Sequence, residues 1–424
     1  MLRYELISCH DCGVLHQYRP VRPREKARCV RCGSVLYRGI HSDPDRMAAI
    51  TLGAIVVFLI AQFFPIVELQ VGGYSTSATL LGSIQVLWRE KMQAVAAVVF
   101  LFTILLPAVE LGSLLYVTMA LRDGRRPPGF DYLLRAVGTA RRWGMTEVLM
   151  IGILITIVKM TSLAQVMLQP GLFAFGALTL MLAIVTCFDP KLLWNIGEHL
   201  PGPGRPRPSQ REFHYKSVPG GAHLEACHSC GLVASVPRSA RNQHCERCGA
   251  KLHRRRPDSI GRTWAFLLAA TILYIPAMLL PVMYTDSLFG TEDDTIISGV
   301  LLFWNSGSQA LAVIIFIASI VVPVLKLAAL TLLALTAQRR SRWRPQERTA
   351  LYRIVEFVGR WSMLDIFVIT LTVALVRFQT LAVITAGPGA LAFCAVVVLT
   401  MLASMQFDPR LIWDATDSNG EKHA

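Results

Sequence analysis

The chain alternates long apolar stretches with short charged segments, and this pattern occurs twice. Apolar stretches of about 17 to 29 residues can cross a hydrocarbon core roughly 30 Å thick. Eight such stretches predict four spans in each half: 47–67, 93–121, 144–168 and 172–188, then 263–282, 309–336, 362–385 and 389–407. The predicted fold is therefore a mainly α, polytopic membrane protein.

Matched landmarks indicate that the two halves are a tandem duplication. Trp88 corresponds to Trp304, Trp143 to Trp361, and the Phe-Asp-Pro sequence at 188–190 to that at 407–409, with an offset close to 217 residues. Self-similarity at a fixed period is the signature of an internal repeat. The predicted domains are a ribbon at 1–42, a four-span bundle at 43–197, a Pro- and Arg-rich linker at 198–223, a second ribbon at 224–257 and a second bundle at 258–424.

Composition and charge distribution predict the membrane topology. The chain is 53% hydrophobic and 17% charged, which excludes an ordinary soluble protein, and its net charge is +14. Arginines cluster between the second and third spans of each half, and cytoplasmic loops carry such an excess of basic residues. Both ribbons and both termini are then predicted to be cytoplasmic, with the repeats parallel to each other.

Eight of the ten cysteines form four Cys-x-x-Cys pairs, each followed by glycine. Four thiolates from two such pairs suit a tetrahedral zinc ion and leave no open coordination position for catalysis. We predict two structural Zn²⁺ sites, with iron or a dithiol redox centre as the alternatives. Nearby histidines are expected at the surface. The predicted ligands are Cys9, Cys12, Cys29 and Cys32 in the first ribbon and Cys227, Cys230, Cys245 and Cys248 in the second.

Ionisable residues inside the predicted spans differ between the halves. Ionisable side chains in a bilayer usually face a bundle interior or a wet cavity. In the first half, Glu110 and Lys159 could neutralise each other, and Glu147 lies near the cytoplasmic end. In the second half, Lys326 corresponds to Glu110, Arg377 to Lys159 and Asp365 to Glu147. We predict that Lys326, Arg377 and Asp365 line a cavity for a phospholipid headgroup, the alternative being a structural ion pair and a snorkelling arginine.

Each fourth span is followed by Asp-Pro and a short apolar run that ends in Trp194 or Trp413. Asp suits a helix N-cap and Pro the first helical position. These runs are predicted to be helices in the membrane interface, with the tryptophans as anchors, the second forming the C-terminal part of the second bundle.

The duplicated ribbons in register with the spans, and the Phe-Asp-Pro-Arg-Leu-Ile-Trp-Asp sequence at 407–414, resemble the paraquat-inducible protein A family. The resemblance covers essentially the whole chain. It implies tetraspanin-like bundles in the inner membrane of a Gram-negative bacterium. It also implies a periplasm-spanning partner with mammalian-cell-entry (MCE) domains, and phospholipid movement that maintains the outer membrane.

A lipid-transport subunit is thus the leading functional prediction, with phospholipid, the membrane and the MCE protein as partners and without nucleic acid. The sequence lacks a G-x-x-x-x-G-K-[ST] phosphate loop, and we predict that the protein is not an enzyme. The alternative is a membrane-bound thiol redox or metal-sensing protein that uses the Cys-x-x-Cys pairs.

Overall fold

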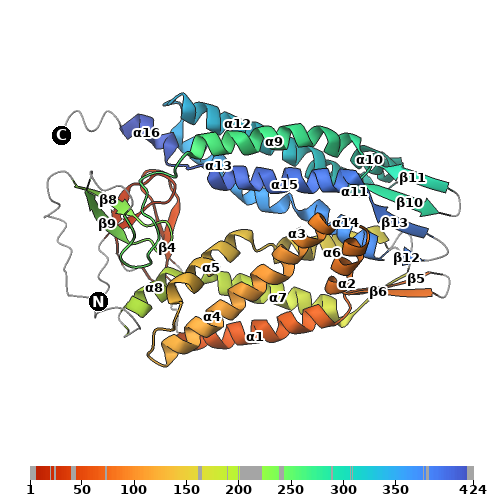
Figure 1. Ribbon diagram of the computed structural model, residues 1–424, viewed down its shortest axis with the longest axis horizontal. Coiled ribbons are helices and arrows are strands. Elements are labelled where there is room, and N and C mark those ends of the chain that lie inside the picture. The colour runs from red at the N-terminus through yellow and green to blue at the C-terminus, as the bar shows by residue number, and fades with distance from the viewer. Residues whose placement is uncertain are drawn as a thin grey trace.

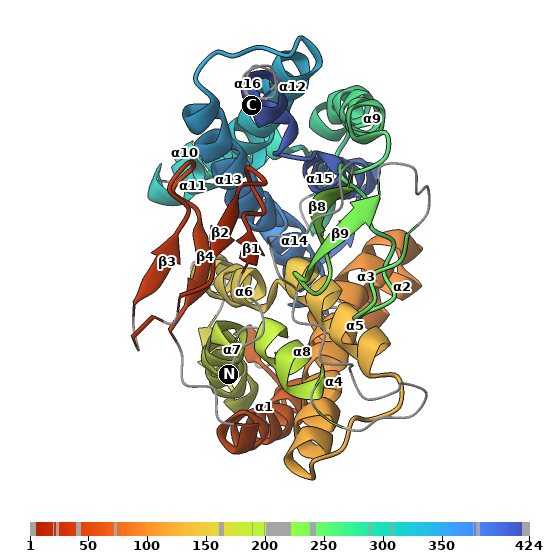
Figure 2. The ribbon, with the colours of Figure 1, turned by 90° about the vertical axis from the view of Figure 1, so that its left-hand side faces the viewer.

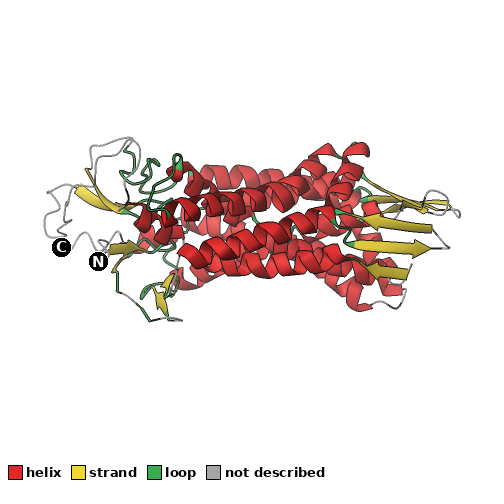
Figure 3. Ribbon diagram, turned by 90° about the horizontal axis from the view of Figure 1, so that it is seen from below, coloured by secondary structure: helices red, strands yellow, loops and turns green. Residues whose placement is uncertain are grey.

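The computed structural model describes residues 6–19, 21–22, 25–39, 44–71, 74–160, 165–188, 190–198, 200, 222–237, 243–287, 290–305, 307, 309–375, 377–378 and 382–417. Long helices run side by side along the longest axis of the molecule (Figure 1). The cysteine ribbons lie at one end of these helices, the ribbon end, and two small sheets at the other, the sheet end (Figure 3). Most of the predicted linker, residues 201–221, lies outside the described residues.

The first copy consists of ribbon 1 and bundle 1. Ribbon 1 holds β1 (Leu6–Ser8), β2 (Leu15–Gln17), β3 (Lys26–Arg28) and β4 (Val35–Arg38). Bundle 1 holds α1 (Pro44–Phe63), β5 (Val67–Val71), β6 (Tyr74–Ala78), α2 (Leu80–Arg89), α3 (Gln93–Phe100), the π-helical turn η1 (Leu101–Leu105), α4 (Leu106–Arg122), α5 (Phe130–Trp143), α6 (Thr146–Met160), β7 (Gln165–Leu168), α7 (Pro170–Cys187) and α8 (Pro190–Glu198).

The second copy repeats this order. Ribbon 2 holds β8 (Ala222–Ala226) and β9 (Val233–Pro237). Bundle 2 holds α9 (Ser259–Leu279), β10 (Met283–Ser287), β11 (Gly290–Asp294), α10 (Ile296–Asn305), α11 (Gln309–Phe316), the π-helical turn η3 (Ile317–Val321), α12 (Val322–Gln338), α13 (Pro345–Trp361), α14 (Leu364–Leu375), β12 (Arg377–Phe378), β13 (Ala382–Ala386), α15 (Pro388–Gln406) and α16 (Leu411–Asp417).

Six helical segments in the described part of the chain are long and apolar enough to cross a membrane. They correspond to the first, second and fourth predicted spans of each copy: Pro44–Phe63, Gln93–Arg122, Pro170–Cys187, Ser259–Leu279, Ala312–Gln338 and Pro388–Thr416. The third predicted spans correspond to α6 and α14, which have 15 and 12 residues. Each follows an Arg-bearing helix, α5 or α13, that the apolar pattern did not predict.

The ends of the third predicted spans are strands, which corrects the predicted helices at these positions. β7 pairs antiparallel with β5, and β13 pairs with β10, giving the sheet orders β6-β5-β7 and β11-β10-β13-β12. A short apolar run does not by itself distinguish a strand from a helix. The first spans are also shorter than predicted, because α1 and α9 end just before Pro65 and Pro281.

Both second spans contain a π-helical turn at the same position in the repeat. Leu106 N donates to Leu101 O, and Val322 N donates to Ile317 O. Pro107 and Pro323 follow immediately, and a proline cannot donate the backbone hydrogen bond that a regular α-helix needs there. The wider turn accommodates the missing donor in both bundles.

The apolar packing of the ribbons is crosswise, because each ribbon packs against the bundle of the other copy. Cys9, Cys12 and Cys29 of ribbon 1 belong to an apolar cluster with residues of bundle 2, among them Phe407 and Trp413. The four cysteines of ribbon 2 belong to a cluster with residues of bundle 1: Met47, Leu114, Val117, Leu121, Phe130, Leu134, Val137, Val185, Phe188, Leu193 and Trp194. The ribbon end of the molecule, where this crossing occurs, faces the viewer in Figure 2.

The same side-chain pair forms the centre of each docking surface. The guanidinium carbon of Arg31 lies 4.5 Å from the ring centroid of Trp413, and that of Arg247 lies 5.9 Å from the ring centroid of Trp194. These are cation–π distances. The two tryptophans are 3% and 2% exposed, so they pack inside the protein instead of serving as the predicted membrane anchors.

Crosswise docking predicts crossed effects of the two matched variants. Trp413→Ala removes a buried aromatic side chain and should destabilise the docking of ribbon 1 by about 3–5 kcal/mol, while ribbon 2 stays docked. Trp194→Ala should have the reverse effect. Hydrogen exchange of the two ribbons, measured on the full chain, checks this. If Trp413→Ala loosened ribbon 2 and left ribbon 1 protected, the docking scheme would be wrong.

Candidate metal centres and intramembrane charges

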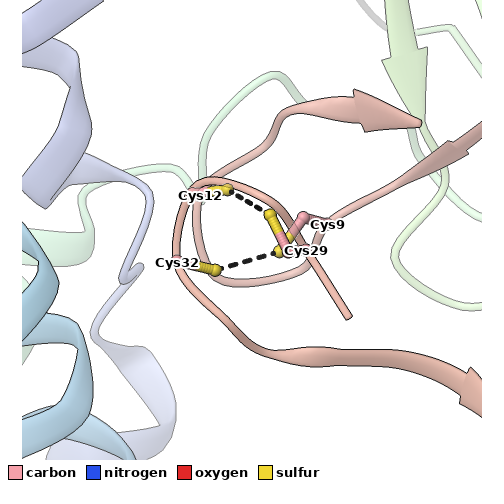
Figure 4. Close-up of side chains that lie close together, drawn as sticks. All are labelled: Cys9, Cys12, Cys29 and Cys32. Atoms are coloured by element: carbon pink, nitrogen blue, oxygen red, sulfur yellow. Dashed lines mark hydrogen bonds between the residues drawn. The ribbon is translucent and has the colours of Figure 1, made fainter. Parts of the chain in front are cut away.

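The four cysteines of ribbon 1 converge on one point (Figure 4). The sulfur of Cys9 lies 3.5 Å from that of Cys32, the sulfur of Cys12 lies 3.5 Å from that of Cys29, and all four lie within 4.8 Å of one another. Four thiolates at about 2.3 Å from a central ion have sulfurs roughly 3.8 Å apart, whereas a disulfide brings them to about 2.05 Å. The geometry is that of a four-thiolate metal site.

Ribbon 2 repeats this geometry. The sulfurs of Cys227 and Cys248 are 3.5 Å apart, those of Cys230 and Cys245 are 3.6 Å apart, and the four again lie within 4.8 Å of one another. The structure thus brings together both predicted ligand sets.

The backbone explains the glycine after each pair. In all four turns the glycine N–H donates to the carbonyl of the first cysteine, at 2.8–2.9 Å. The four glycines have φ between 68° and 78°, a region that other residues adopt with strain. This tight turn presents two sulfurs to one side. The glycines are Gly13, Gly33, Gly231 and Gly249.

Neighbouring groups favour a thiolate in each cluster. A hydrogen bond from Cys12 lowers the pKa of Cys9 far below its ordinary value, and hydrogen bonds from Cys230, Cys245 and Cys248 do the same for Cys227. The thiolate is the form that coordinates a metal ion. Both clusters can therefore hold a metal ion, and the surrounding apolar residues shield them from solvent.

Two of the histidines near the cysteines make specific contacts, the partly buried His16 and His228, which is exposed as expected. His16 Nε2 lies 3.2 Å from the sulfur of Cys29. His228 Nε2 lies 2.9 Å from the guanidinium of Arg410, which also donates two hydrogen bonds to the buried carboxylate of Asp408. Burial and the charge of Arg410 lower the pKa of His228, which fits a neutral ring that accepts from Arg410. Through Arg410, the Phe-Asp-Pro-Arg sequence at 407–410 thus contacts ribbon 2 directly.

Glu110 in bundle 1 is neutralised by Arg141, a residue that the charge pattern did not identify as its partner. Arg141 Nε donates to Glu110 Oε1 at 2.9 Å, and the two side chains are 13% and 6% exposed. The same guanidinium donates to the carbonyls of Phe188, at 2.7 Å, and Val185, at 3.0 Å. Glu110 thus has Arg141 as a partner, and the side chain of Lys159, near the end of α6, lies outside the described residues.

Bundle 2 has neither member of this pair. Lys326 occupies the position of Glu110, and Gly359 occupies that of Arg141. Lys326 is 2% exposed, and its ammonium group donates to Thr400 Oγ1 at 2.9 Å. Gly359 provides the space, because a Cβ there would lie 3.3 Å from Lys326 Nζ. Among the described side chains, no carboxylate forms an ion pair with Lys326.

A different arginine takes over the helix-capping role of Arg141 in bundle 2. Arg256, which precedes α9, donates to the carbonyls of Met405 and Phe407, the latter at 3.3 Å. Phe407 corresponds to Phe188. Ser259 and Tyr352 of bundle 2 donate to the neighbouring carbonyls of Gln406 and Ser404, so the end of α15 needs no arginine at the position opposite Lys326, which is glycine.

The remaining predicted intramembrane residues lie elsewhere in the fold. Glu147 is exposed in the first turn of α6. Lys159 and Asp365 lie on α6 and α14, and Arg377 begins β12 in the sheet. The side chains of these last three are outside the described residues. From Gly359 to Arg377 the backbone passes along α14, whose 12 residues rise about 18 Å, so Arg377 lies well toward the sheet end from Lys326.

Comparison of the whole sequence with known proteins identifies the same family that the sequence motifs resemble. The sequence model of the paraquat-inducible protein A family matches residues 45–197 and 260–417. Intermembrane transport protein PqiA of Escherichia coli K12 is 34% identical to this chain, over 96% of the chain and 95% of its own length. The chain belongs to the paraquat-inducible protein A family.

Two further relatives also match this chain over nearly its full length. Lipophilic envelope-spanning tunnel protein A of E. coli K12 is 29% identical, over 98% of this chain and 92% of its own length. A probable intermembrane transport protein of Haemophilus influenzae is 28% identical, over 98% and 97%. No solved structure gives a significant match.

The sulfur geometry predicts two metal ions per purified chain. Cys29→Ser in ribbon 1 should reduce the content to one, and so should Cys245→Ser in ribbon 2, because each variant removes one of four ligands from a single site. Elemental analysis by mass spectrometry measures the metal content. A wild-type chain that contains no metal ion and has four disulfides would contradict this interpretation.

The contacts of Arg141 predict that it stabilises bundle 1. Arg141→Ala should destabilise the protein by about 3–5 kcal/mol, because the buried carboxylate of Glu110 loses its partner. The double variant Glu110→Gln/Arg141→Met should be less destabilised, since it leaves no buried charge. Thermal unfolding in detergent compares the two. Equal losses in both variants would show that the ion pair itself does not account for the effect.

Proposed function

We propose that this chain is an inner-membrane subunit of a bacterial lipid-transport system. It passes phospholipid to or from a periplasm-spanning MCE-domain protein and so helps to maintain the outer membrane. Eight spans place both ribbons and both termini in the cytoplasm, where the ribbons hold Zn²⁺. The proposal is supported by the relatives named as intermembrane transport and envelope-spanning tunnel proteins, and by six membrane-length apolar helices.

The environment of Lys326 is the observation that best supports lipid handling by bundle 2. A charged side chain inside a membrane is costly and generally has a functional reason. In bundle 1 the equivalent charge is neutralised by Arg141, whereas Lys326 has a hydroxyl partner and a glycine beside it. An ammonium group in this position suits the phosphate of a phospholipid that enters when the bundle opens. The proposal also includes Asp365, on α14, and Arg377, at the start of β12, in the lipid path.

The sulfur geometry favours a structural metal role over thiol redox chemistry. Redox cysteines need accessible thiolates, whereas seven of the eight ribbon cysteines are buried and their sulfurs lie at tetrahedral spacing. Four thiolates around one ion complete its coordination shell. The ribbons then hold the two bundles together at the ribbon end instead of carrying out a reaction.

Exchanging the charge environment tests the role of bundle 2. The double variant Lys326→Glu/Gly359→Arg recreates the pair of bundle 1 inside bundle 2. We expect it to fold and keep two metal ions, but to transfer labelled phospholipid between vesicles at least about tenfold more slowly, because the site for the phosphate now carries a neutralised carboxylate.

The matched control is Glu110→Gln/Arg141→Met in bundle 1, which should keep near wild-type transfer. Thermal unfolding and metal content identify any variant that is simply misfolded. Normal transfer by the folded bundle 2 variant would refute a role for Lys326. Loss of transfer in the bundle 1 control alone would move the lipid path to bundle 1.

A further inference from the structure

The β3–β4 hairpin of ribbon 1 concentrates positive charge on exposed side chains. Glu25 is the one acidic residue between positions 19 and 38, and its carboxylate accepts a hydrogen bond from the backbone N–H of Arg22 at 3.0 Å. The exposed cations are Arg19, Arg22, Lys26, Arg28 and Arg38.

The strand register brings two of these cations together. Lys26 lies directly opposite Arg38 in the antiparallel pair. Like charges at opposed positions destabilise a hairpin. None of the five cations forms an ion pair with any residue that the structure describes. An external anion would therefore relieve a repulsion that the fold itself leaves uncompensated.

The hairpin lies beside the entry of the chain into bundle 1. β4 ends at Arg38 and α1 begins at Pro44, so at most about 20 Å of extended chain separates them. β3 and β4 reach the side edge of the molecule in Figure 2, at the ribbon end of the helices. The end of a membrane-spanning helix marks the depth of the lipid headgroups. The cations are thus within reach of the membrane surface.

Contacts of ribbon 1 with bundle 2 fix the orientation of the hairpin. Arg353 donates to Asp11 Oδ2 at 2.8 Å and to the carbonyl of Cys32 at 2.6 Å, and Arg31 donates to Thr416 Oγ1 at 2.9 Å. The cysteine turns contact bundle 2, and Leu36 in β4 packs against the same apolar cluster, whereas the five cations stay exposed. The β8–β9 hairpin of ribbon 2, which corresponds to β1–β2, contains neither Lys nor Arg, whereas the segment that corresponds to β3–β4 carries the exposed Lys251 and Arg254.

We propose that the β3–β4 hairpin of ribbon 1 binds the anionic lipid headgroups of the membrane at the ribbon end. Phosphate diesters such as phosphatidylglycerol supply the negative charge, and the arginine guanidinium groups match phosphate oxygens. Ribbon 1 then has two binding surfaces. Its cysteine turns contact bundle 2, and its β3–β4 hairpin contacts the lipid headgroups. This inference does not depend on phospholipid being transported.

Hydrogen exchange of the full chain in nanodiscs tests the proposal. One set of nanodiscs contains phosphatidylcholine alone, and the other contains about one third phosphatidylglycerol. We expect exchange in residues 25–39 to slow about fivefold or more in the anionic nanodiscs, and this protection to disappear at high salt. The β8–β9 hairpin of ribbon 2, which contains neither Lys nor Arg, should exchange equally in both sets.

Two matched variants isolate the charge. Arg19→Gln/Lys26→Gln/Arg38→Gln should lose the protection, and Arg19→Lys/Arg38→Lys should keep it; unchanged metal content shows that the ribbon is folded in both. Equal exchange of wild-type residues 25–39 in the two nanodisc types would overturn the proposal. A single-stranded RNA that protects the hairpin in neutral nanodiscs more than phosphatidylglycerol does would overturn it in favour of a nucleic-acid partner.

Discussion

The crosswise docking of the ribbons determines how the rest of the molecule is assembled. A ribbon of some 35 residues cannot bury enough apolar surface to fold on its own, and a metal site is the usual remedy. Here the cysteine turns also pack against the helices that end each bundle, through Arg31 on Trp413 and Arg247 on Trp194. Because each ribbon docks on the bundle of the other copy, neither half is complete without its counterpart, and the duplication produces one body instead of two.

Within this symmetric frame, the buried charges break the symmetry. Glu110 and Arg141 form an ion pair that also satisfies the end of α7. In bundle 2, Arg256 takes over that end-capping contact, Gly359 leaves room, and Lys326 contacts Thr400. One bundle thus has a compensated interior and the other a cation whose partner is a neutral hydroxyl. This difference is the physical basis for the proposal that bundle 2, and not bundle 1, handles lipid.

The sequence was sufficient to predict the duplication, the two four-cysteine clusters and the six long apolar helices, because spacing and apolar length reflect those features directly. It did not predict α5 and α13, whose arginine-rich faces do not resemble a span. Nor did it distinguish β7 and β13 from the ends of helices, since strand pairing with β5 and β10 is a long-range contact. The partner of Glu110 was missed for the same reason: Arg141 lies in the predicted loop and reaches the bundle only because α5 packs against α4. Trp194 and Trp413 were assigned to the membrane interface because the docking of the opposite ribbon cannot be inferred from local sequence.

The central claim is that the interior of bundle 2, and not that of bundle 1, receives a phospholipid headgroup. A cryo-electron microscopy reconstruction of the full chain in a phospholipid nanodisc, at a resolution that shows headgroup phosphates, tests it most directly. The account predicts phosphate density within ion-pair distance of Lys326 Nζ in at least one particle class, and none between Glu110 and Arg141. A phosphate bound inside bundle 1, with Lys326 still enclosed by Thr400 and Gly359 in every class, would contradict it.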